Sequence, residues 1–261
     1  MKESTLNHQQ IHTGSLILVN TEYPYQSIKN EPMLPVFDAF PSIKLQHRAG
    51  ALLASLFDVL HCRSMIVPVS GWRSHTEQQQ IWQDTITEHG LEYTQKYVAI
   101  PGHSEHETGL AIDLALKQDT IDFICPEFPY HGICQQFRQR CADFGFIERY
   151  PAGKEPITKI GHEPWHFRYV GIPHAKIIQS HGFTLEEYHD FIKRFCFGKS
   201  AYHQQCGHLD VFVSYLNAHA NLTYLKINSQ FPYSFSGNNS DGFIITEWRY
   251  PYGHSNKLRN A

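Results

Sequence analysis

Residues 104–113 read SEHETGLAID and residues 162–166 read HEPWH, and these two stretches decide the fold that we expect. Residues 110–116 alternate enough in polarity to predict a strand that carries Asp113. His106 precedes that strand, and a glycine lies between His106 and Asp113, where a tight turn would be useful. The pattern therefore predicts a loop histidine and a strand carboxylate at one place.

The second stretch adds another imidazole, His166, on a strand expected at residues 165–170. Together with His106 and Asp113, it makes a set of two imidazoles and one carboxylate. On zinc, three such ligands leave one coordination position open for water, and Glu163 could take the proton of that water. Structural zinc sites usually close the shell with thiolates, but the sequence contains no C-x-x-C pair. The two stretches thus indicate one catalytic zinc ion in a peptidase.

HEPWH also matches the pattern H-E-x-x-H, which in zincins places two ligand histidines on one face of a helix. Here Pro164 would remove a helical donor and disfavour the helical conformation at Glu163, so we expect an extended chain. In that conformation His166 binds the metal and Glu163 lies over the open position. His162 is then expected to be a spectator or a hydrogen-bonding neighbour and not a ligand.

Arg73 follows a strand expected at residues 64–70 and precedes a helix expected at residues 76–88, for which Ser74 is a plausible cap with Glu77 three residues later. A guanidinium group fixed there could stabilise the negative charge that builds up during hydrolysis. Arginines that pair with surface carboxylates are commoner, so the residue pattern alone leaves both roles open.

The rest of the chain predicts an α+β fold in which a small antiparallel sheet is flanked by helices. Apolar spacing predicts further helices at residues 44–62, 133–144, 173–180 and 184–195, and a short apolar run predicts a strand at residues 15–20. After residue 197, Gly, Asn, Ser and Tyr become frequent, and strands are expected at residues 222–227 and 243–250. We therefore predict two domains, residues 1–197 and a β-rich C-terminal appendage at residues 198–261.

Composition excludes several classes of protein. The 261 residues carry a net charge of −3 with scattered Lys and Arg, so nucleic acid is not an expected partner. Neither a signal peptide nor a membrane-spanning run is evident, which predicts a cytoplasmic enzyme whose oligomeric state stays open. The six cysteines are irregularly spaced and are expected to be reduced thiols.

Three motifs carry a family resemblance: S-x-H-x-x-G-x-A-x-D at residues 104–113, E-x-x-H at residues 163–166 and SGWRS at residues 70–74. Together they resemble the zinc D,D-peptidases of the VanX/VanY family from vancomycin-resistance clusters. Over residues 12–195 the chain is most similar to the VanXY-type D,D-dipeptidase/D,D-carboxypeptidases, whereas the residues from 198 onward match nothing that we recognise in the shorter members.

The resemblance implies a role for each matching residue. It implies zinc on His106, Asp113 and His166, and it implies that Glu163 is the general base and that Arg73 stabilises the transition state. It further implies that Gln78 and Ser104 contact the substrate and that Trp165 supports the pocket. The implied activity is hydrolysis of D-Ala-D-Ala, removal of the terminal D-Ala from peptidoglycan precursors, or both, which gives glycopeptide resistance.

Two alternatives stay open. One is a zinc endopeptidase that cuts other peptidoglycan peptide bonds, although the wall-binding module or export signal that such enzymes need is not evident. The other is a non-catalytic binding protein that keeps the zinc fold. Glu163 and Arg73 argue against the binding protein, because a binder has no chemical need for a base together with a partner for an oxyanion.

Overall fold

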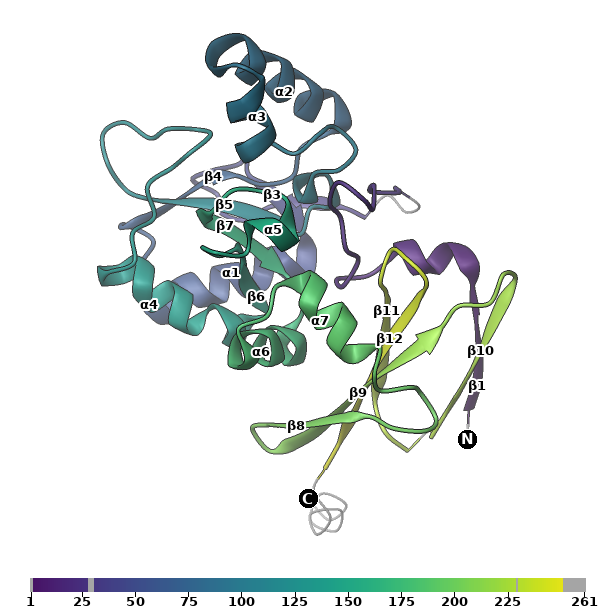
Figure 1. The fold of residues 1–261 in the computed structure, drawn as a ribbon. Coiled ribbons are helices and arrows are strands. Elements are labelled where there is room, and N and C mark those ends of the chain that lie inside the picture. Colours follow the sequence, from purple (N-terminus) through teal and green to yellow (C-terminus); the bar gives the residue numbers. More distant parts are fainter. Residues whose placement is uncertain (1, 28–30, 229, 251–261) are drawn as a thin grey trace. The chain divides into compact units, whose positions relative to one another are not determined.

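A four-stranded antiparallel sheet carries Asp113 of the first quoted stretch and residues 163–166 of the second, and its strands are ordered β4-β5-β7-β6 (Figure 1). The strands are β4 (Ile66–Ser70), β5 (Ala111–Leu116), β6 (Phe146–Tyr150) and β7 (Glu163–Tyr169). This computed structural model describes residues 2–27, 31–228 and 230–250. The expected strands at 64–70, 110–116 and 165–170 are confirmed within a few residues, and the expected α+β class with them.

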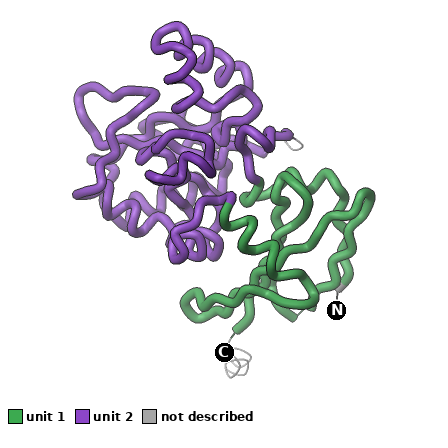
Figure 2. The backbone as a smooth tube through the Cα atoms, viewed as in Figure 1, with its two compact units in different colours: residues 1–17, 187–261 green, residues 18–186 purple. Residues whose placement is uncertain are grey.

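The chain forms two compact units (Figure 2). Unit 2 consists of residues 18–186, and unit 1 combines residues 1–17 with residues 187–261. The predicted domains, 1–197 and 198–261, divide the chain at one point, whereas these units divide it at two. The reason is strand pairing, because β1 (Lys2–Asn7) pairs with β10 (Leu222–Ile227) and so joins the start of the chain to its C-terminal part.

The two faces of the central sheet carry different chemistry. Ile112 and Leu114 of β5 and Phe167 of β7 belong to the main hydrophobic cluster of unit 2. Side chains alternate between the two faces of a strand. Asp113 lies between Ile112 and Leu114, and His166 directly precedes Phe167, so both point to the opposite face of the sheet. One face of the sheet therefore holds the core, and the other holds the predicted ligands.

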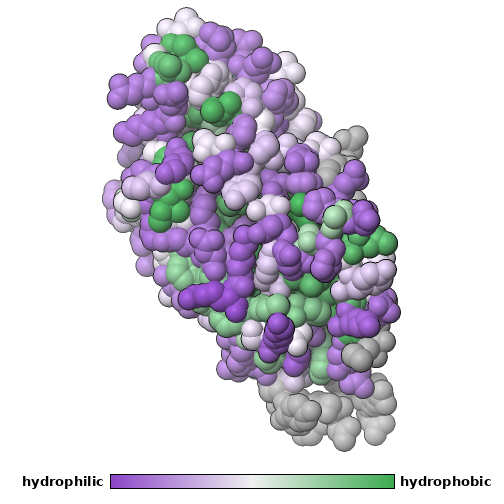
Figure 3. Space-filling model, turned by 45° about the vertical axis from the view of Figure 1, so that its right-hand side comes forward, coloured by the Kyte–Doolittle hydropathy of each residue, from purple (hydrophilic) through white to green (hydrophobic). Residues whose placement is uncertain are grey.

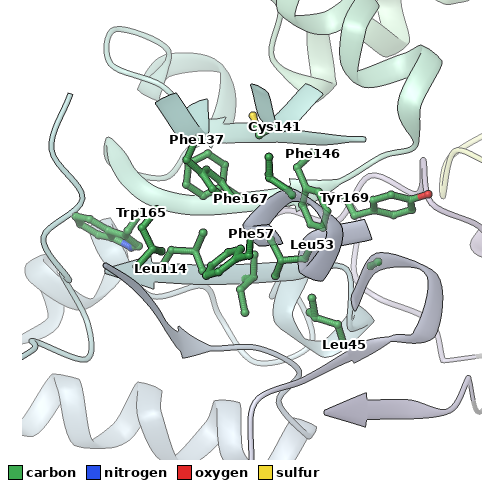
Figure 4. Packing of buried hydrophobic residues seen from close by; sticks show 14 of the residues in the cluster. Leu45, Leu53, Phe57, Leu114, Phe137, Cys141, Phe146, Trp165, Phe167 and Tyr169 are labelled. Carbon is green, nitrogen blue, oxygen red and sulfur yellow. The ribbon is translucent and has the colours of Figure 1, made fainter. Parts of the chain in front are cut away.

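Helices α1 (His47–Leu60) and α4 (Gly132–Cys141) contribute to that hydrophobic cluster. Leu53 and Phe57 of α1 are fully buried, and Phe137 of α4 packs edge-on against Phe57 and Phe167, with ring centroids 5.9 and 4.9 Å apart (Figure 4). Aromatic pairs prefer this edge-to-face geometry. The expected helices at 44–62 and 133–144 are confirmed, except that Lys44–Gln46 forms strand β3 and the last turn of the second is the 3-10 helix η3 (Ala142–Phe144).

Helix α2 (His75–His89) begins directly after Arg73. The Ser74 side chain accepts a hydrogen bond from the Glu77 amide, and the Glu77 carboxylate accepts one from the Ser74 amide. This reciprocal capping box confirms the predicted cap and fixes where the helix starts. Arg73 is thereby held between the end of β4 and the first turn of α2.

Shorter elements complete unit 2. They are β2 (Met33–Pro35), which pairs with β3, helix α3 (Leu91–Tyr97), the 3-10 helix η2 (Glu105–Thr108), and helices α5 (Glu155–Thr158) and α6 (Ile172–His181). Helix α7 (Leu185–Ile192) begins in unit 2 and continues into unit 1. Helices α6 and α7 confirm the two helices expected near residues 173–195.

Unit 1 is rich in strands, as the sequence predicts for the C-terminal part. Its main sheet has the order β11-β12-β9-β8, formed by β8 (Tyr202–Cys206), β9 (Leu209–Asn217), β11 (Tyr233–Gly237) and β12 (Gly242–Arg249). Its core contains Leu6 and Ile11 from the start of the chain with Leu225, Phe243 and Ile245. The first element after β1 is the 3-10 helix η1 (His8–His12).

The strand expected at residues 15–20 is wrong. This apolar run forms no strand, although residues 16–19 are buried. The amide of Leu16 donates its hydrogen bond to the Ser236 hydroxyl and not to a neighbouring strand. A short apolar run indicates burial, but it does not by itself identify the partner of its backbone groups.

Two further expectations concern the whole chain. All six cysteines are free thiols, as predicted. Within the part of the chain that the structure describes, no helix is long and apolar enough to cross a bilayer. On the face drawn in Figure 3, hydrophobic residues occur in small groups between hydrophilic ones. The predicted cytoplasmic location stays a prediction.

Truncation of the aromatic core provides a test of the fold. Phe137→Ala removes a fully buried ring that contacts three other phenylalanines, so we expect the free energy of unfolding of unit 2 to fall by about 3–5 kcal/mol. Denaturant unfolding followed by tryptophan fluorescence measures this loss. Val59→Ala on α1, where the side chain is 51% exposed, is the control and should change it by less than about 0.5 kcal/mol. Equal losses in the two variants would contradict the packing described.

Candidate metal and catalytic site

Three predicted ligands from two strands and a 3-10 helix meet in unit 2. Asp113 of β5 and His166 of β7 are directly paired in the register of the two antiparallel strands. His106 comes from η2, and Gly109, which ends η2 with a φ of 70°, turns the chain into β5. One ligand atom from each of His106, Asp113 and His166 lies within 4.8 Å of the others, and all three residues are buried. The predicted cluster is therefore assembled in space.

Hydrogen bonds determine which ring nitrogens face the centre of the cluster. His106 Nδ1 lies 2.7 Å from the carbonyl oxygen of Gly71 and donates to it, so Nε2 is directed at Asp113, with Oδ2 3.1 Å away. On the other side, His166 Nδ1 lies 2.9 Å from Asp113 Oδ1. Asp113 thus lies between the two imidazoles and faces His106 with one oxygen and His166 with the other.

The Gly71 carbonyl group, which orients His106, is positioned by the close approach of the Gly71 backbone to the backbone of Lys44. A Cβ atom at Gly71 would lie 2.4 Å from the carbonyl oxygen of Lys44, so only glycine fits there. The amide of Trp72, the next residue, donates to that same Lys44 carbonyl at 2.7 Å. The SGWRS motif therefore holds the Gly71 carbonyl against His106 and also places Arg73 at the site.

The electrostatics of the cluster suit a cation. Burial alone would raise the pKa of Asp113, but the neighbouring His106 and His166 outweigh it and hold the pKa well below its usual range. Burial, together with the charge of Arg73, lowers the pKa of His106. An ionised carboxylate beside a neutral imidazole is the donor set that zinc accepts. The residues present therefore fit a zinc ion.

Glu163 begins strand β7, and the extended chain that was expected at Pro164 is confirmed. The helical zincin arrangement is accordingly absent from this stretch. Glu163 Oε2 lies 3.7 Å from His166 Nδ1, and the side chain lines the same cavity as the three ligands. Burial raises the pKa of Glu163 to about 8, so this carboxyl group can hold a proton near neutral pH.

Arg73 is fixed by three side chains. Its guanidinium donates to Ser70 Oγ at 2.8 Å, to Gln78 Oε1 at 3.2 Å and to Asp113 Oδ2 at 3.2 Å. Gln78 is fully buried, and its amide nitrogen donates to the carbonyl oxygen of Ala99 at 2.8 Å. Gln78 therefore lies behind Arg73, whereas Arg73 itself lines the cavity.

Ser104 and Trp165, the other two residues that the resemblance implied, both line the cavity. The Ser104 hydroxyl also accepts a hydrogen bond from the amide of His106, which ties this wall to the ligand-bearing helix. Trp165 is 8% exposed and belongs to the hydrophobic cluster on the core side of the sheet. Trp165 is thus shared between the cavity lining and the hydrophobic cluster.

His162 lies outside the cluster, as expected for a spectator. Its Nε2 is 2.7 Å from the Tyr130 hydroxyl, and the two rings are stacked with centroids 5.8 Å apart. The Tyr130 hydroxyl also donates to Glu148. His162 is therefore engaged in a separate polar group and is absent from the three residues whose ligand atoms meet.

Several residues of the site escaped the sequence analysis. The loop after β5 contributes Phe123, whose ring lies 5.5 Å from the Arg73 guanidinium carbon, and β6 contributes Tyr150, whose ring packs on His166 at 4.9 Å. No motif marks either residue.

Glu105 is a further residue of the site that lies within the quoted stretch but was not singled out there. Burial alone would raise the pKa of its carboxyl group, yet the charges of Arg149 and Arg168 outweigh burial and hold that pKa below its usual range. Its burial near His166 depends on the folded chain, so the sequence gives no signal for its place in the site.

His203, Cys206 and His208 are three further potential metal ligands that lie close together in the sequence. Among residues 2–27, 31–228 and 230–250, the cluster at Asp113 is the one group of three potential ligands found close enough to share an ion. His203 instead pairs with Asp210, with Nε2 and Oδ1 2.8 Å apart.

Comparisons with known proteins identify relatives of this chain. A family model described as VanY, D-alanyl-D-alanine carboxypeptidase, matches residues 42–172. The bifunctional D-Ala-D-Ala dipeptidase and D-Ala-D-Ala carboxypeptidase VanXYC of Enterococcus gallinarum is 41% identical over 182 residues, which cover 69% of this chain and 95% of that protein. These shares are large enough to establish the family.

Solved structures extend the likeness. The crystal structure of the vancomycin-resistance D,D-dipeptidase VanXYg, in complex with a D-Ala-D-Ala phosphinate analog, is 44% identical and covers 95% of this chain and 99% of its own, with a TM-score of 0.93. A VanY D,D-pentapeptidase from a VanB-type resistance cassette, in complex with Zn(II), is 31% identical and covers 67% of this chain, with a TM-score of 0.57. Through its motifs, its fold and these relatives, the chain belongs to the VanY family of D-alanyl-D-alanine carboxypeptidases.

Proposed function

We propose that this protein is a zinc-dependent D,D-peptidase that hydrolyses the dipeptide D-Ala-D-Ala, removes the terminal D-Ala from peptidoglycan precursors, or both, and so confers glycopeptide resistance. The observation that carries the proposal is that His106, Asp113 and His166 converge in one cavity with Glu163 and Arg73. Membership of a D-alanyl-D-alanine carboxypeptidase family supports the choice of reaction. A non-catalytic binder would not need this base and guanidinium at the ligand cluster.

In this proposal one zinc ion would be held by His106 Nε2, by the carboxylate of Asp113 and by His166 Nδ1. These are the atoms that face one another in the buried cluster. When bound, zinc would polarise the scissile carbonyl group and make water acidic enough to attack at neutral pH. Three protein ligands leave room for water or substrate, as a catalytic site requires.

Glu163 would move the proton. It would accept a proton from the attacking water and deliver it to the nitrogen of the departing D-Ala. Its position beside His166 and its elevated pKa support this role, because a group that exchanges protons works best when its pKa is near the working pH. The general base and the general acid would therefore be one residue.

Arg73 would stabilise the negative charge that develops on the substrate oxygen. A guanidinium held by Ser70 and Gln78 is already oriented, so little reorganisation accompanies the reaction. Gln78 would act by holding Arg73, since it lies behind that side chain and off the cavity wall. Ser104 and Trp165, which do line the cavity, would border the bound peptide.

Loss of one ligand should abolish metal retention. In Asp113→Ala the shell keeps only two protein ligands, so we expect zinc content after dialysis and peptidase activity both to be lost. His162→Ala is the matched control, because His162 bonds to Tyr130 outside the cluster, and it should keep most of the zinc. Elemental analysis of both variants checks this. Full zinc content in Asp113→Ala, or its loss in His162→Ala, would contradict the proposed ligand set.

Replacement of the proposed base should separate chemistry from binding. Glu163→Gln keeps the size of the side chain but cannot accept the water proton, so kcat should fall by about 10²–10⁴-fold. Zinc content and the circular dichroism spectrum should match the wild type. Activity within a few-fold of the wild type would place the base elsewhere in the cavity.

The substrate can be tested on the purified, zinc-loaded protein. We expect release of D-Ala from D-Ala-D-Ala and from UDP-linked pentapeptide, with little cleavage of L-Ala-L-Ala or D-Ala-D-Lac. The reason is that Arg73 would fix the position of the carbonyl group, so that inversion of a flanking centre would turn its methyl group into the cavity wall. A chelator should stop the reaction. Efficient cleavage of L-Ala-L-Ala, or no cleavage of D-Ala-D-Ala, would reject the proposal; cleavage only within other peptidoglycan peptides would favour the endopeptidase alternative.

A further inference from the structure

Glu105 is a fully buried carboxylate at the outer edge of the ligand cluster, and neither the metal set nor the proposed chemistry uses it. Its Oε1 atom is 2.8 Å from Arg149 Nε and 2.9 Å from an Arg168 guanidinium nitrogen. Its Oε2 atom has no hydrogen-bond partner and faces His166, with Nε2 3.6 Å away. The two oxygens therefore have different surroundings: one faces cations, and the other faces a ligand histidine.

The His166 imidazole shows the complementary arrangement. Its Nδ1 is directed at Asp113. Its Nε2 is buried, makes no hydrogen bond in this structure and points at Glu105. The ring of Tyr150 packs against the same imidazole. A neutral imidazole carries one proton, and the nitrogen that keeps it leaves the other nitrogen as the metal ligand. A fixed acceptor at Nε2 would therefore leave Nδ1 for the metal.

Arg149 and Arg168 hold that acceptor in place. Arg149 lies on β6 and Arg168 on β7, both side chains are fully buried, and Arg149 also binds Glu186 through two nitrogens, at 2.9 and 2.7 Å. This second carboxylate balances the charge, so two arginines face two glutamates. Because the guanidinium groups restrain Oε1, the orientation of Oε2 toward His166 is fixed by the fold.

We propose that Glu105 is a positioning residue for His166: its Oε2 atom accepts the Nε2 proton of the imidazole, so that Nδ1 is presented to the metal. This inference rests on the metal-binding role proposed above for His166. The gap of 3.6 Å is longer than a normal N–H···O hydrogen bond, and we expect it to shorten when the metal fixes the ring. A carboxylate behind a ligand histidine raises the basicity of that ligand and fixes its orientation.

The alternative is that Glu105 only neutralises two buried arginines. Zinc affinity distinguishes these roles in Glu105→Gln. Arg149 and Arg168 would attract the amide oxygen of the glutamine, so its NH₂ group would turn toward His166. The NH₂ group and the protonated Nε2 are both donors and cannot form a hydrogen bond with each other. Positioning therefore predicts that the Kd for zinc, measured by competition with a chromophoric chelator, rises by about 10–100-fold. The absorption bands of the Co(II)-substituted protein should shift as well.

Glu107→Gln is the matched control. Glu107 lies on the same 3-10 helix and is equally buried, but its carboxylate accepts hydrogen bonds from the amides of Gly102 and Ser104 and pairs with His75, away from the ligand cluster. We expect the zinc affinity and the Co(II) spectrum of the Glu107→Gln variant to match those of the wild type. If Glu105→Gln also matches the wild type, positioning is overturned while the proposed function stands. If the wild type itself binds no zinc, the proposed function fails first.

A measurement on the unaltered protein covers the case in which Glu105→Gln does not fold, since that variant leaves two buried arginines with one carboxylate. Nitrogen-15 NMR of histidine-labelled, zinc-loaded wild type reports which ring nitrogen carries the proton. The His166 signals can be assigned by their loss in a His166→Gln variant. Positioning predicts a protonated Nε2 whose proton exchanges slowly and a metal-bound Nδ1. A protonated Nδ1, or an Nε2 bound to zinc, would overturn it.

Discussion

The cross-strand pair of Asp113 and His166 is the interaction on which the rest of the site depends. The antiparallel register of β5 and β7 sets these two residues opposite each other on the face that does not carry the core. A shift of β7 by one residue against β5 would turn His166 toward the hydrophobic cluster and away from Asp113. The apolar residues on either side, such as Ile112 and Phe167, therefore fix the proposed metal site as firmly as they fix the fold.

The other groups are placed by backbone constraints that converge on this pair. The Gly71 carbonyl orients His106, and the turn at Gly109 returns the chain into β5. The start of α2 and the end of β4 hold Arg73 beside Asp113. Backbone contacts thus hold the charged side chains of the cavity in place. Because these groups are already oriented, little reorganisation of the protein would accompany a reaction.

The sequence predicted most of this arrangement because chemistry and periodicity pointed the same way at these positions. The alternation around Asp113 indicated a strand, and Pro164 within HEPWH indicated an extended chain. Ser74 indicated the start of a helix, and the structure agrees at all three positions. It predicted less where the outcome depends on distant partners. The pairing of β1 with β10 and the burial of residues 16–19 involve segments far apart in the chain, and Tyr150 and Phe123 reach the cavity without any motif.

The central claim is that one zinc ion lies between His106, Asp113 and His166. Anomalous X-ray diffraction from crystals of the zinc-loaded protein, recorded on both sides of the zinc absorption edge, tests it directly. The account predicts a single strong peak at roughly 2.0–2.2 Å from His106 Nε2, an Asp113 carboxylate oxygen and His166 Nδ1. A peak bound by other residues, or no peak at this cluster in zinc-loaded crystals, would contradict it.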